Sequence, residues 1–274
     1  MPRAQHVLVE QKPLKGWREW VYRSTVTLAI SIVRVFMFMR VTGTENLPRS
    51  GPVLVVSNHP SYLDPPTLVG ISIYWGGRDL SIMAWDKLFH IPFVAFFTRV
   101  YKAYPVDREN PGRGPYMTLL DILKKGGVAG VFPEGSRSPQ RTMGPWKPGA
   151  LRAAFATQAT ILPVSFLTVG EFWPRGRWRP RLFRKHLVQI HKPIPFADYG
   201  KNIPDGPAGR AAQEVLAESL RQTINAPVNE RDQALRAHFE AASRRADPLR
   251  GREPPAEQLQ QEARERRVFR ILGW

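Results

Sequence analysis

Residues 53–64 read Val-Leu-Val-Val-Ser-Asn-His-Pro-Ser-Tyr-Leu-Asp, and the rest of the chain is organised around this stretch. Its first four residues are apolar and mostly β-branched, which predicts a short buried strand. His59 then stands near the carboxyl end of that strand, the edge at which open α/β sheets bind their ligands. Prolines follow both His59 and Asp64 and disfavour helix at these two residues, so we expect a tight turn between them.

A turn of this length can bring the Asp64 carboxylate back to the His59 imidazole. A carboxylate that accepts the Nδ1 proton of a histidine fixes its tautomer and leaves Nε2 free to take a proton from a hydroxyl. Two plainer interpretations stay open on this stretch alone: a buried histidine with satisfied hydrogen bonds, and an aspartate that only caps the next helix.

Three further blocks follow in order. They are residues 87–93 (Lys-Leu-Phe-His-Ile-Pro-Phe) together with 104–108 (Tyr-Pro-Val-Asp-Arg), residues 132–138 (Phe-Pro-Glu-Gly-Ser-Arg-Ser) and residues 161–164 (Ile-Leu-Pro-Val). With the His-x4-Asp stretch they resemble the four motifs of the glycerolipid acyltransferases, the family of lysophosphatidic acid acyltransferases. The resemblance covers residues 41–200, and four blocks in the expected order argue against a chance match.

The resemblance implies transfer of an acyl group from acyl-CoA or acyl carrier protein to the free hydroxyl of a lysophospholipid, with lysophosphatidic acid as the leading acceptor. It implies that His59 is the general base, that Asp64 orients it, and that the hydroxyl attacks the thioester directly. The family's acceptor-binding positions fall on Arg108, Glu134, Gly135 and Arg137, with main-chain amides near Gly135 or Ser136 as an oxyanion site. Ser136 is therefore counted with the substrate-binding residues, and we expect neither a metal nor a resident cofactor.

The third block supports part of this on chemical grounds alone. A glycine at 135 lets backbone amides approach an anion, and Arg137 supplies a fork of donors beside it. Glu134 among so much positive charge is open to a second interpretation, as a salt-bridge partner. Two positions depart from the family pattern: Lys102 stands where glycine is frequent, which leaves the acceptor headgroup open, and Ser136 stands where threonine is more usual.

The remaining apolar runs predict an α/β fold with a single open, mostly parallel sheet flanked by helices. Further strands are predicted at 80–84, 104–107, 128–132, 160–167 and 187–190. Pro163 lies inside one of them, so we expect an edge or a bulge there. The organisation is an acyltransferase domain over 41–200, amphipathic N-terminal helices over 1–40, and a helical, charged C-terminal extension over 201–274.

The N-terminal segment is basic and aromatic. Residues 1–40 hold seven Lys or Arg against two acidic residues, and their longest charge-free stretch, Ser24–Val33, has ten residues. A bilayer span needs roughly 20. We therefore predict a helix lying in the membrane interface, which places a peripheral or monotopic protein on the cytoplasmic face of the cell membrane. A helix packed across the core and a tilted span remain alternatives.

Composition narrows the chemistry and the partners. The 274 residues include no cysteine, which excludes disulfides, cysteine-ligated zinc and a thiol acyl-enzyme. The formal charge is +17, with 30 arginines and 10 lysines, which suits phosphate and carboxylate partners. We expect an anionic membrane surface, a lysophospholipid, and acyl-CoA or an acidic acyl carrier protein. No nucleic acid is expected, because no nucleic-acid-binding motif is present.

Rival functions remain at this stage. The same chemistry on a lyso-ornithine lipid or a glycolipid is the nearest of them. A catalytically silent lipid-binding or scaffolding protein is the rival from another class, and it conflicts with the intact pair of His59 and Asp64.

Overall fold

The computed structural model describes residues 16–36, 38–107, 110, 112–137, 143–167, 186–200 and 206–246. The chain forms two compact units, Met1–Asn229 and Glu230–Trp274. Every strand and the core described below belong to the first unit. Of the second unit, the described part is the helical stretch 230–246.

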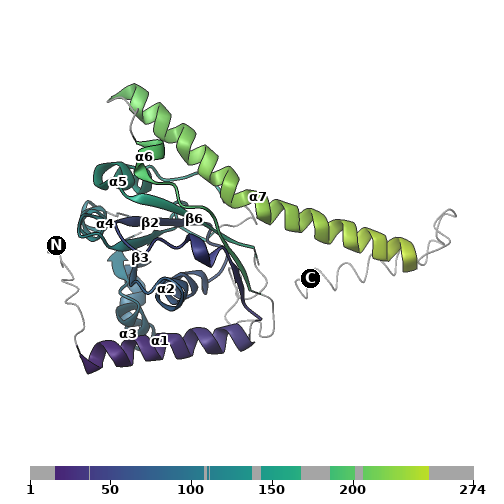
Figure 1. Ribbon diagram of the computed structural model, residues 1–274, viewed down its shortest axis with the longest axis horizontal. Coiled ribbons are helices and arrows are strands. Elements are labelled where there is room, and N and C mark those ends of the chain that lie inside the picture. The colour runs from purple at the N-terminus through teal and green to yellow at the C-terminus, as the bar shows by residue number, and fades with distance from the viewer. Residues whose placement is uncertain are drawn as a thin grey trace. The chain divides into compact units, whose positions relative to one another are not determined.

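A seven-stranded sheet forms the centre of the first unit, in the order β1-β7-β6-β2-β5-β3-β4 (Figure 1). All neighbouring strands run parallel except β6 and β7, which confirms the prediction of an open, mostly parallel sheet. The strands are β1 (Arg40–Thr42), β2 (Val53–Ser57), β3 (Leu80–Trp85), β4 (Tyr104–Val106), β5 (Val128–Val131), β6 (Thr160–Phe166) and β7 (Leu187–Ile190).

Helices cover both faces of this sheet. They are α1 (Trp17–Phe36), α2 (Asp64–Tyr74), α3 (Pro92–Val100), α4 (Gly114–Lys124), α5 (Gly149–Thr157), α6 (Phe196–Tyr199) and α7 (Pro207–Ala246), with the 3₁₀ helices η1 (Thr44–Asn46) and η2 (Asp86–His90). Side chains of a strand alternate between its two faces. Leu54 and Val56 of β2 accordingly join a core with α4, α5, α6 and α7, while Val53 and Val55 join one with α1 and α2.

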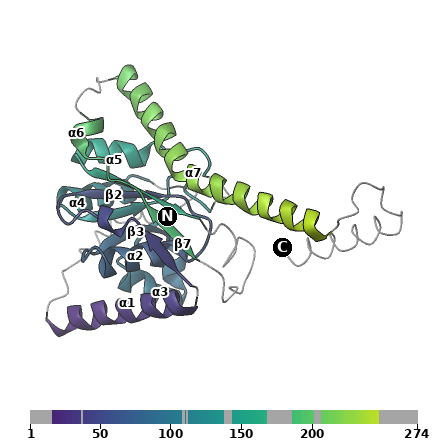
Figure 2. The same ribbon diagram turned by 45° about the vertical axis from the view of Figure 1, so that its right-hand side comes forward.

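The N-terminal helix α1 packs on α2 along one face, as both ribbon views show (Figures 1 and 2). Tyr22, Val26 and Ile30, spaced four residues apart, are buried there. Gly70 of α2 permits the close approach, because a Cβ at this position would come within 2.6 Å of the Ile30 side chain. One face of α1 therefore fits the alternative of a packed helix.

Another part of α1 exposes apolar side chains. Trp17 and Trp20 are each 71% exposed, and Leu28 is 62% exposed. Among the described helices, none combines the length and the hydropathy that crossing a bilayer requires. The exposed tryptophans leave the predicted interfacial role of α1 as a proposal, which we take up below.

The expectation of a sheet edge at Pro163 was wrong, since β6 lies inside the sheet between β2 and β7. The alternative expectation, a bulge, comes closer. Ile161 pairs with Ile194, and Val164 pairs with Ile190. Between these two pairs the facing segment therefore has one residue more than β6, as in a bulge. The Pro163 carbonyl accepts a hydrogen bond from the amide of His191 on that side. Pro163 has no N–H to donate, and it lies where the pairing of β6 with the chain after β7 is irregular.

Candidate active site

The first and third sequence blocks meet because β2 and β5 are parallel neighbours. His59 follows the end of β2, and Glu134, Gly135 and Arg137 follow the end of β5. The carboxyl ends of parallel neighbours lie at the same edge of a sheet, so the fold itself brings these residues together.

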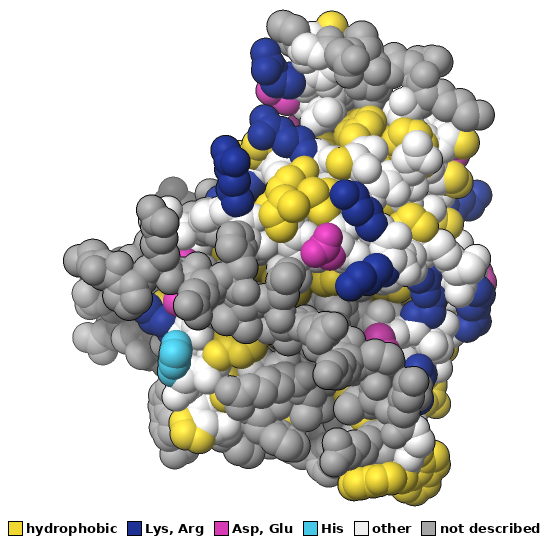
Figure 3. Space-filling view, turned by 90° about the vertical axis from the view of Figure 1, so that its left-hand side faces the viewer, with side chains coloured by type: hydrophobic (Ala, Val, Ile, Leu, Met, Phe, Trp, Pro, Cys, Tyr) yellow, Lys and Arg dark blue, Asp and Glu magenta, His cyan; other side chains and the backbone are white. Residues whose placement is uncertain are grey.

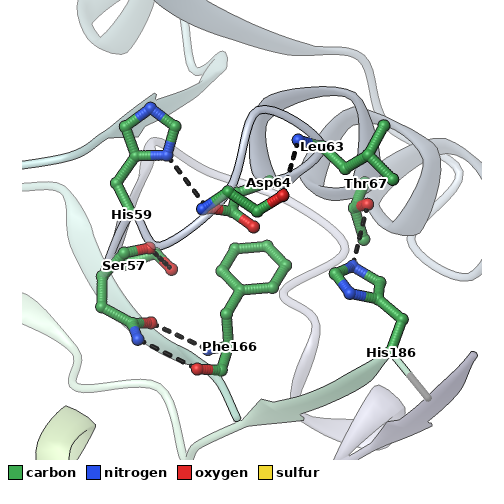
Figure 4. A network of polar contacts seen from close by, with 9 residues as sticks. Ser57, His59, Leu63, Asp64, Thr67, Phe166 and His186 are labelled. Carbon is green, nitrogen blue, oxygen red and sulfur yellow. Dashed lines mark hydrogen bonds and ion pairs between the residues drawn. The ribbon is translucent and has the colours of Figure 1, made fainter. Parts of the chain in front are cut away.

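His59 and Asp64 form the pair that their spacing predicts. The Nδ1 atom of His59 lies 3.0 Å from Oδ2 of Asp64 (Figure 4). Asp64 is the first residue of α2, where prolines 65 and 66 start the helix and a negative charge is favoured by the helix dipole. The same Oδ2 accepts the Ser61 amide at 2.6 Å, and the Ser61 hydroxyl accepts the Leu63 amide at 3.2 Å.

Asp64 is fully buried, and its Oδ1 has no hydrogen-bond partner. Burial raises the pKa of this carboxyl, while its hydrogen bond with His59, the His59 charge, the Ser61 amide and the charge of Arg137 act in the opposite direction. The carboxylate is thus held away from water with its charge directed at the imidazole. Such an arrangement fixes the orientation of His59 and stabilises the imidazolium that forms when the ring takes a proton.

The far side of the His59 ring is oriented for proton transfer. The His59 side chain is 10% exposed, and its ring stacks on Phe132, with ring centroids 4.1 Å apart and an angle of 22° between the planes. In Figure 4 the nitrogen that is not bonded to Asp64 points away from the carboxylate. The contacts with Phe132 and Asp64 fix the orientation of the ring, and Nε2 is the ring nitrogen that does not bond to Asp64.

Asn58 links the first block to Phe166 at the end of β6, two residues after the fourth block, a role that the sequence did not single out. Its Nδ2 donates to the carbonyl of Phe166 at 3.0 Å, and its Oδ1 accepts the Phe166 amide at 2.8 Å. Both bonds are buried and cross from the end of β2 to the end of β6. Asn58 therefore fixes the backbone directly before His59.

The third block forms a turn that is tied to residues 143–147. The amide of Gly144 donates to Oε2 of Glu134 at 3.0 Å, so the backbone helps to orient this carboxylate. Gly135 has φ +71°, a conformation that favours glycine, and a Cβ here would lie 2.8 Å from Nζ of Lys147. The Gly135 amide donates to the Phe132 carbonyl, which leaves the Ser136 amide as the stronger oxyanion candidate.

Arg137 joins the third block to the first. Its guanidinium stacks on the ring of Tyr62, 3.6 Å from the centroid, and Tyr62 lies between His59 and Asp64 in the sequence. Ser136 is exposed beside it. Arg108, the other arginine predicted to bind the acceptor, lies outside the described residues.

Lys102 lies at the amino ends of the strands, opposite to the ends that carry the candidate site. It precedes β4, and its Nζ donates to Oδ2 of Asp79, the residue before β3, at 2.5 Å. Lys102 follows the end of α3 and has a φ of +50°, in the left-handed region. Glycine adopts this conformation without strain, which explains why a glycine suits this position. Lys102 therefore lies at the amino ends of β3 and β4, whereas the candidate site residues follow the carboxyl ends of β2 and β5.

Within the described residues, no three His, Cys, Asp or Glu side chains are grouped so that they could ligate a metal ion. The chemistry that the described geometry offers is a carboxylate-oriented imidazole beside an arginine and a glycine turn. These are the groups that general-base catalysis on a hydroxyl requires when the substrate carries an anion.

Comparison with known proteins identifies the family of this chain. Residues 38–167 match the family model described as Acyltransferase. A 1-acyl-sn-glycerol-3-phosphate acyltransferase of Bacillus subtilis is 30% identical over 190 residues, which are 68% of this chain and 88% of the Bacillus protein. The chain belongs to this family of glycerolipid acyltransferases, and it is a member of an enzyme family.

Two further similarities concern length and fold. The chloroplastic 1-acyl-sn-glycerol-3-phosphate acyltransferase LPAT1 of Arabidopsis thaliana is 32% identical over 163 residues, 58% of this chain, and the match spans 44% of the plant protein. The crystal structure of the 1-acyl-sn-glycerophosphate (LPA) acyltransferase PlsC from Thermotoga maritima superposes with a TM-score of 0.61 at 24% identity, covering 80% of this chain and 84% of that one. The latter shows that the two proteins share a fold.

Proposed function

We propose that this protein transfers a fatty acyl group from acyl-CoA or acyl carrier protein to the free hydroxyl of lysophosphatidic acid, giving phosphatidic acid. The observation that carries the proposal is the contact of His59 Nδ1 with the buried Asp64 carboxylate, next to the stacked Arg137. Several relatives bear the name of this activity, including that of Pseudomonas aeruginosa.

In the proposed reaction His59 acts first as a general base and then as a general acid. Nε2 takes the proton of the acceptor hydroxyl while the oxygen attacks the thioester carbonyl. Asp64 stabilises the imidazolium, and the Ser136 amide is the candidate donor to the carbonyl oxygen. The C–S bond then breaks, and the imidazolium returns its proton to the leaving thiolate. A direct transfer is consistent with a sequence that holds no cysteine for a thiol acyl-enzyme.

Recognition of the acceptor phosphate falls to the arginines. A guanidinium binds phosphate through two parallel hydrogen bonds, a geometry that a lysine lacks. Arg137 and Arg108 are the proposed phosphate ligands, with Gly135 shaping the turn beside them. Replacing Arg108 by alanine should weaken binding of the acceptor by about 1.5 to 3 kcal/mol. The kcat/KM for lysophosphatidic acid should then fall about 10- to 150-fold, mostly because the acceptor KM rises. Monoacylglycerol, which lacks the phosphate, should be affected little.

We also propose that the enzyme works at an anionic membrane surface, on the cytoplasmic face, as a peripheral or monotopic protein. The exposed Trp17 and Trp20 of α1 supply apolar contacts. On the face shown in Figure 3, Lys and Arg side chains are more widespread than acidic ones, and hydrophobic side chains gather at its lower corner. Aromatic and basic side chains together favour binding to an anionic lipid interface.

The test is a substrate panel with the purified protein. Lysophosphatidic acid, a lyso-ornithine lipid and a lyso-glycolipid are each offered with acyl-CoA and with acyl carrier protein, and the acylated product is identified by mass spectrometry. The proposal predicts that phosphatidic acid forms with the highest kcat/KM. A higher kcat/KM for either other acceptor would contradict the choice of substrate. Vesicle binding without any product would favour a silent lipid-binding protein.

A further inference from the structure

Asn225 of α7 is buried, and both polar atoms of its side-chain amide form hydrogen bonds with the backbone of Met143. Oδ1 accepts the amide of Met143 at 2.8 Å, and Nδ2 donates to the carbonyl of Met143 at 3.3 Å. Met143 is itself 1% exposed. A pair of bonds to the same residue fixes both the position and the direction of the backbone that follows it.

That backbone, residues 143–148, runs along the third block. Gly144 donates the amide that holds the Glu134 carboxylate, and the Lys147 amide donates to the Pro133 carbonyl at 2.9 Å. The Lys147 side chain lies over Gly135, where only the absence of a Cβ leaves room for it. A shift of this segment would therefore move a carboxylate, an ammonium group and the glycine turn together.

The helix that carries Asn225 has its own attachment to the sheet. The hydroxyl of Ser165 on β6 donates to the carbonyl of Ile224 at 2.8 Å, and Leu220, Ile224 and Val228 are buried. This turn of α7 is thus a fixed support from which Asn225 reaches the segment. The match to the acyltransferase family model ends at residue 167, so the support lies outside the matched part of the chain.

We propose that Asn225 is a positioning residue for acceptor binding: it holds residues 143–148 so that Lys147 and the turn at Gly135 face the acceptor phosphate, while Glu134 stays bound to the Gly144 amide. The inference rests on the proposed function, because it takes the third block as the acceptor site. It assigns a task in the reaction to the C-terminal helix. Lys147 is the additional cation that this arrangement offers to a phosphate group.

The test compares Asn225→Ala with Ser165→Ala. Asn225→Ala removes both bonds to Met143, whereas Ser165→Ala loosens the same turn of α7 without touching residues 143–148. The first variant should raise the acceptor KM about 5- to 30-fold, which corresponds to the loss of one or two hydrogen bonds. Its kcat at saturating acceptor should fall less than the acceptor KM rises, because His59 and Asp64 are held by their own turn and by α2. Ser165→Ala should raise the acceptor KM less than Asn225→Ala does, because both bonds from Asn225 to Met143 and the buried side chains of Leu220, Ile224 and Val228 remain.

Two further measurements make every outcome informative. Asn225→Asp keeps an acceptor for the Met143 amide and loses the donor, so it should show a smaller rise in KM, and it carries the test if the alanine variant does not fold. Stabilisation of each variant by lysophosphatidic acid in a thermal melt reports binding without turnover. An unchanged acceptor KM in Asn225→Ala, or an equal rise in Ser165→Ala, overturns the inference.

The thermal melt also separates this inference from the proposed function. A wild type that is stabilised by lysophosphatidic acid but forms no phosphatidic acid contradicts the proposed reaction alone, and loss of that stabilisation in Asn225→Ala still supports the inference. A wild type that neither binds nor acylates this lipid overturns both.

Discussion

The stack of Arg137 on Tyr62 joins two motifs that are far apart in the sequence. Arg137 has several rotatable bonds, and the flat ring of Tyr62 restricts the guanidinium to a plane beside the His59 and Asp64 pair. An oriented guanidinium loses less entropy when it binds a phosphate. Under the proposed function, in which Arg137 binds the acceptor phosphate, Tyr62 contributes to acceptor affinity by orienting Arg137.

Replacing Tyr62 by leucine should weaken acceptor binding. A cation–π contact contributes about 0.5 to 2 kcal/mol, so the acceptor KM should rise about 2- to 30-fold with little change in kcat. Tyr62→Phe keeps the ring and is the matched control, expected to behave like the wild type. Steady-state kinetics with varied lysophosphatidic acid give both constants. Equal KM values for the leucine variant and the wild type would show that the stack has no part in binding.

The sequence predicted the His59 and Asp64 contact because the two residues lie within one turn, and local spacing determines what can meet there. It did not single out Asn58, Phe132 or Asn225 as site residues. Each of these acts across the fold, as in the bonds from Asn58 to Phe166 and from Asn225 to Met143. No local periodicity encodes such a contact, and only the order of the strands brings the partners together.

At the level of the elements, Lys102 between α3 and β4 has a strained backbone and makes two stabilising side-chain contacts. Lys102 has a positive φ, binds Asp79, and places its ammonium 5.6 Å from the centroid of the Tyr22 ring on α1. Burial raises the pKa of the Tyr22 hydroxyl, with the Asp79 charge acting in the same direction, so this ring stays neutral. The ion pair and the ring contact offset the backbone strain.

Substitutions at Lys102 should separate these two contributions. Lys102→Ala keeps the strain and loses the contacts, so it should lower the free energy of unfolding by about 1 to 2 kcal/mol. Lys102→Gly loses the contacts but also removes the strain, so it should be nearly neutral. Denaturant unfolding measures both, and acceptor KM should be unchanged in both because Lys102 is remote from the site. A changed acceptor KM in the glycine variant would contradict this placement.

His186, directly before β7, couples that strand to α2 in a way that depends on pH. It is buried, its Nε2 lies 3.2 Å from the Thr67 hydroxyl, and its ring stacks on Phe166. Burial lowers the pKa of His186 to about 4. In the unfolded chain a histidine has a pKa of about 6.5, so the unfolded state binds more protons between these values. Protein stability should therefore fall as the pH is lowered from about 6.5 to about 4.

The contribution of His186 to this loss should reach about 3 kcal/mol at the acid end. His186→Phe removes the titrating group, and its stability should fall less steeply over the same range. His90→Phe, which changes an exposed imidazole, is the control. Chemical denaturation at several pH values gives the comparison. Parallel stability curves for His186→Phe and the wild type would show that His186 is not held neutral.

The elements themselves were largely predictable. Apolar runs predicted β2, β3, β4, β5, β6 and β7 close to their observed ends, because buried parallel strands leave continuous apolar sequence. The strand β1 was not predicted. Its three residues, Arg40–Thr42, are too few to show the alternation of apolar and polar residues that marks a strand. They pair with residues of β7 that lie more than 140 positions further along the chain. The interior place of Pro163 was missed for a similar reason, since it depends on the irregular backbone opposite β6.

For the whole molecule, the proposed attachment to membranes rests on α1. Replacing Trp17 and Trp20 together by serine should weaken binding to anionic vesicles, because these are the two most exposed of the large apolar side chains described on α1. Binding by the wild type should also weaken at high salt, since basic residues contribute about 1 kcal/mol each at such a surface and are screened. Vesicle sedimentation measures both effects. Release from native membranes by detergent alone, and by neither salt nor alkaline carbonate, would contradict interfacial binding.

The measurement that tests the central claim most directly is the kcat of His59→Ala for acylation of lysophosphatidic acid. With His59 as the general base, kcat should fall about 100- to 10,000-fold, and Asp64→Asn should retain more activity than His59→Ala. Thermal unfolding of each variant shows whether the fold persists. A folded His59→Ala protein that keeps more than about a tenth of the wild-type kcat would contradict the assignment of the base.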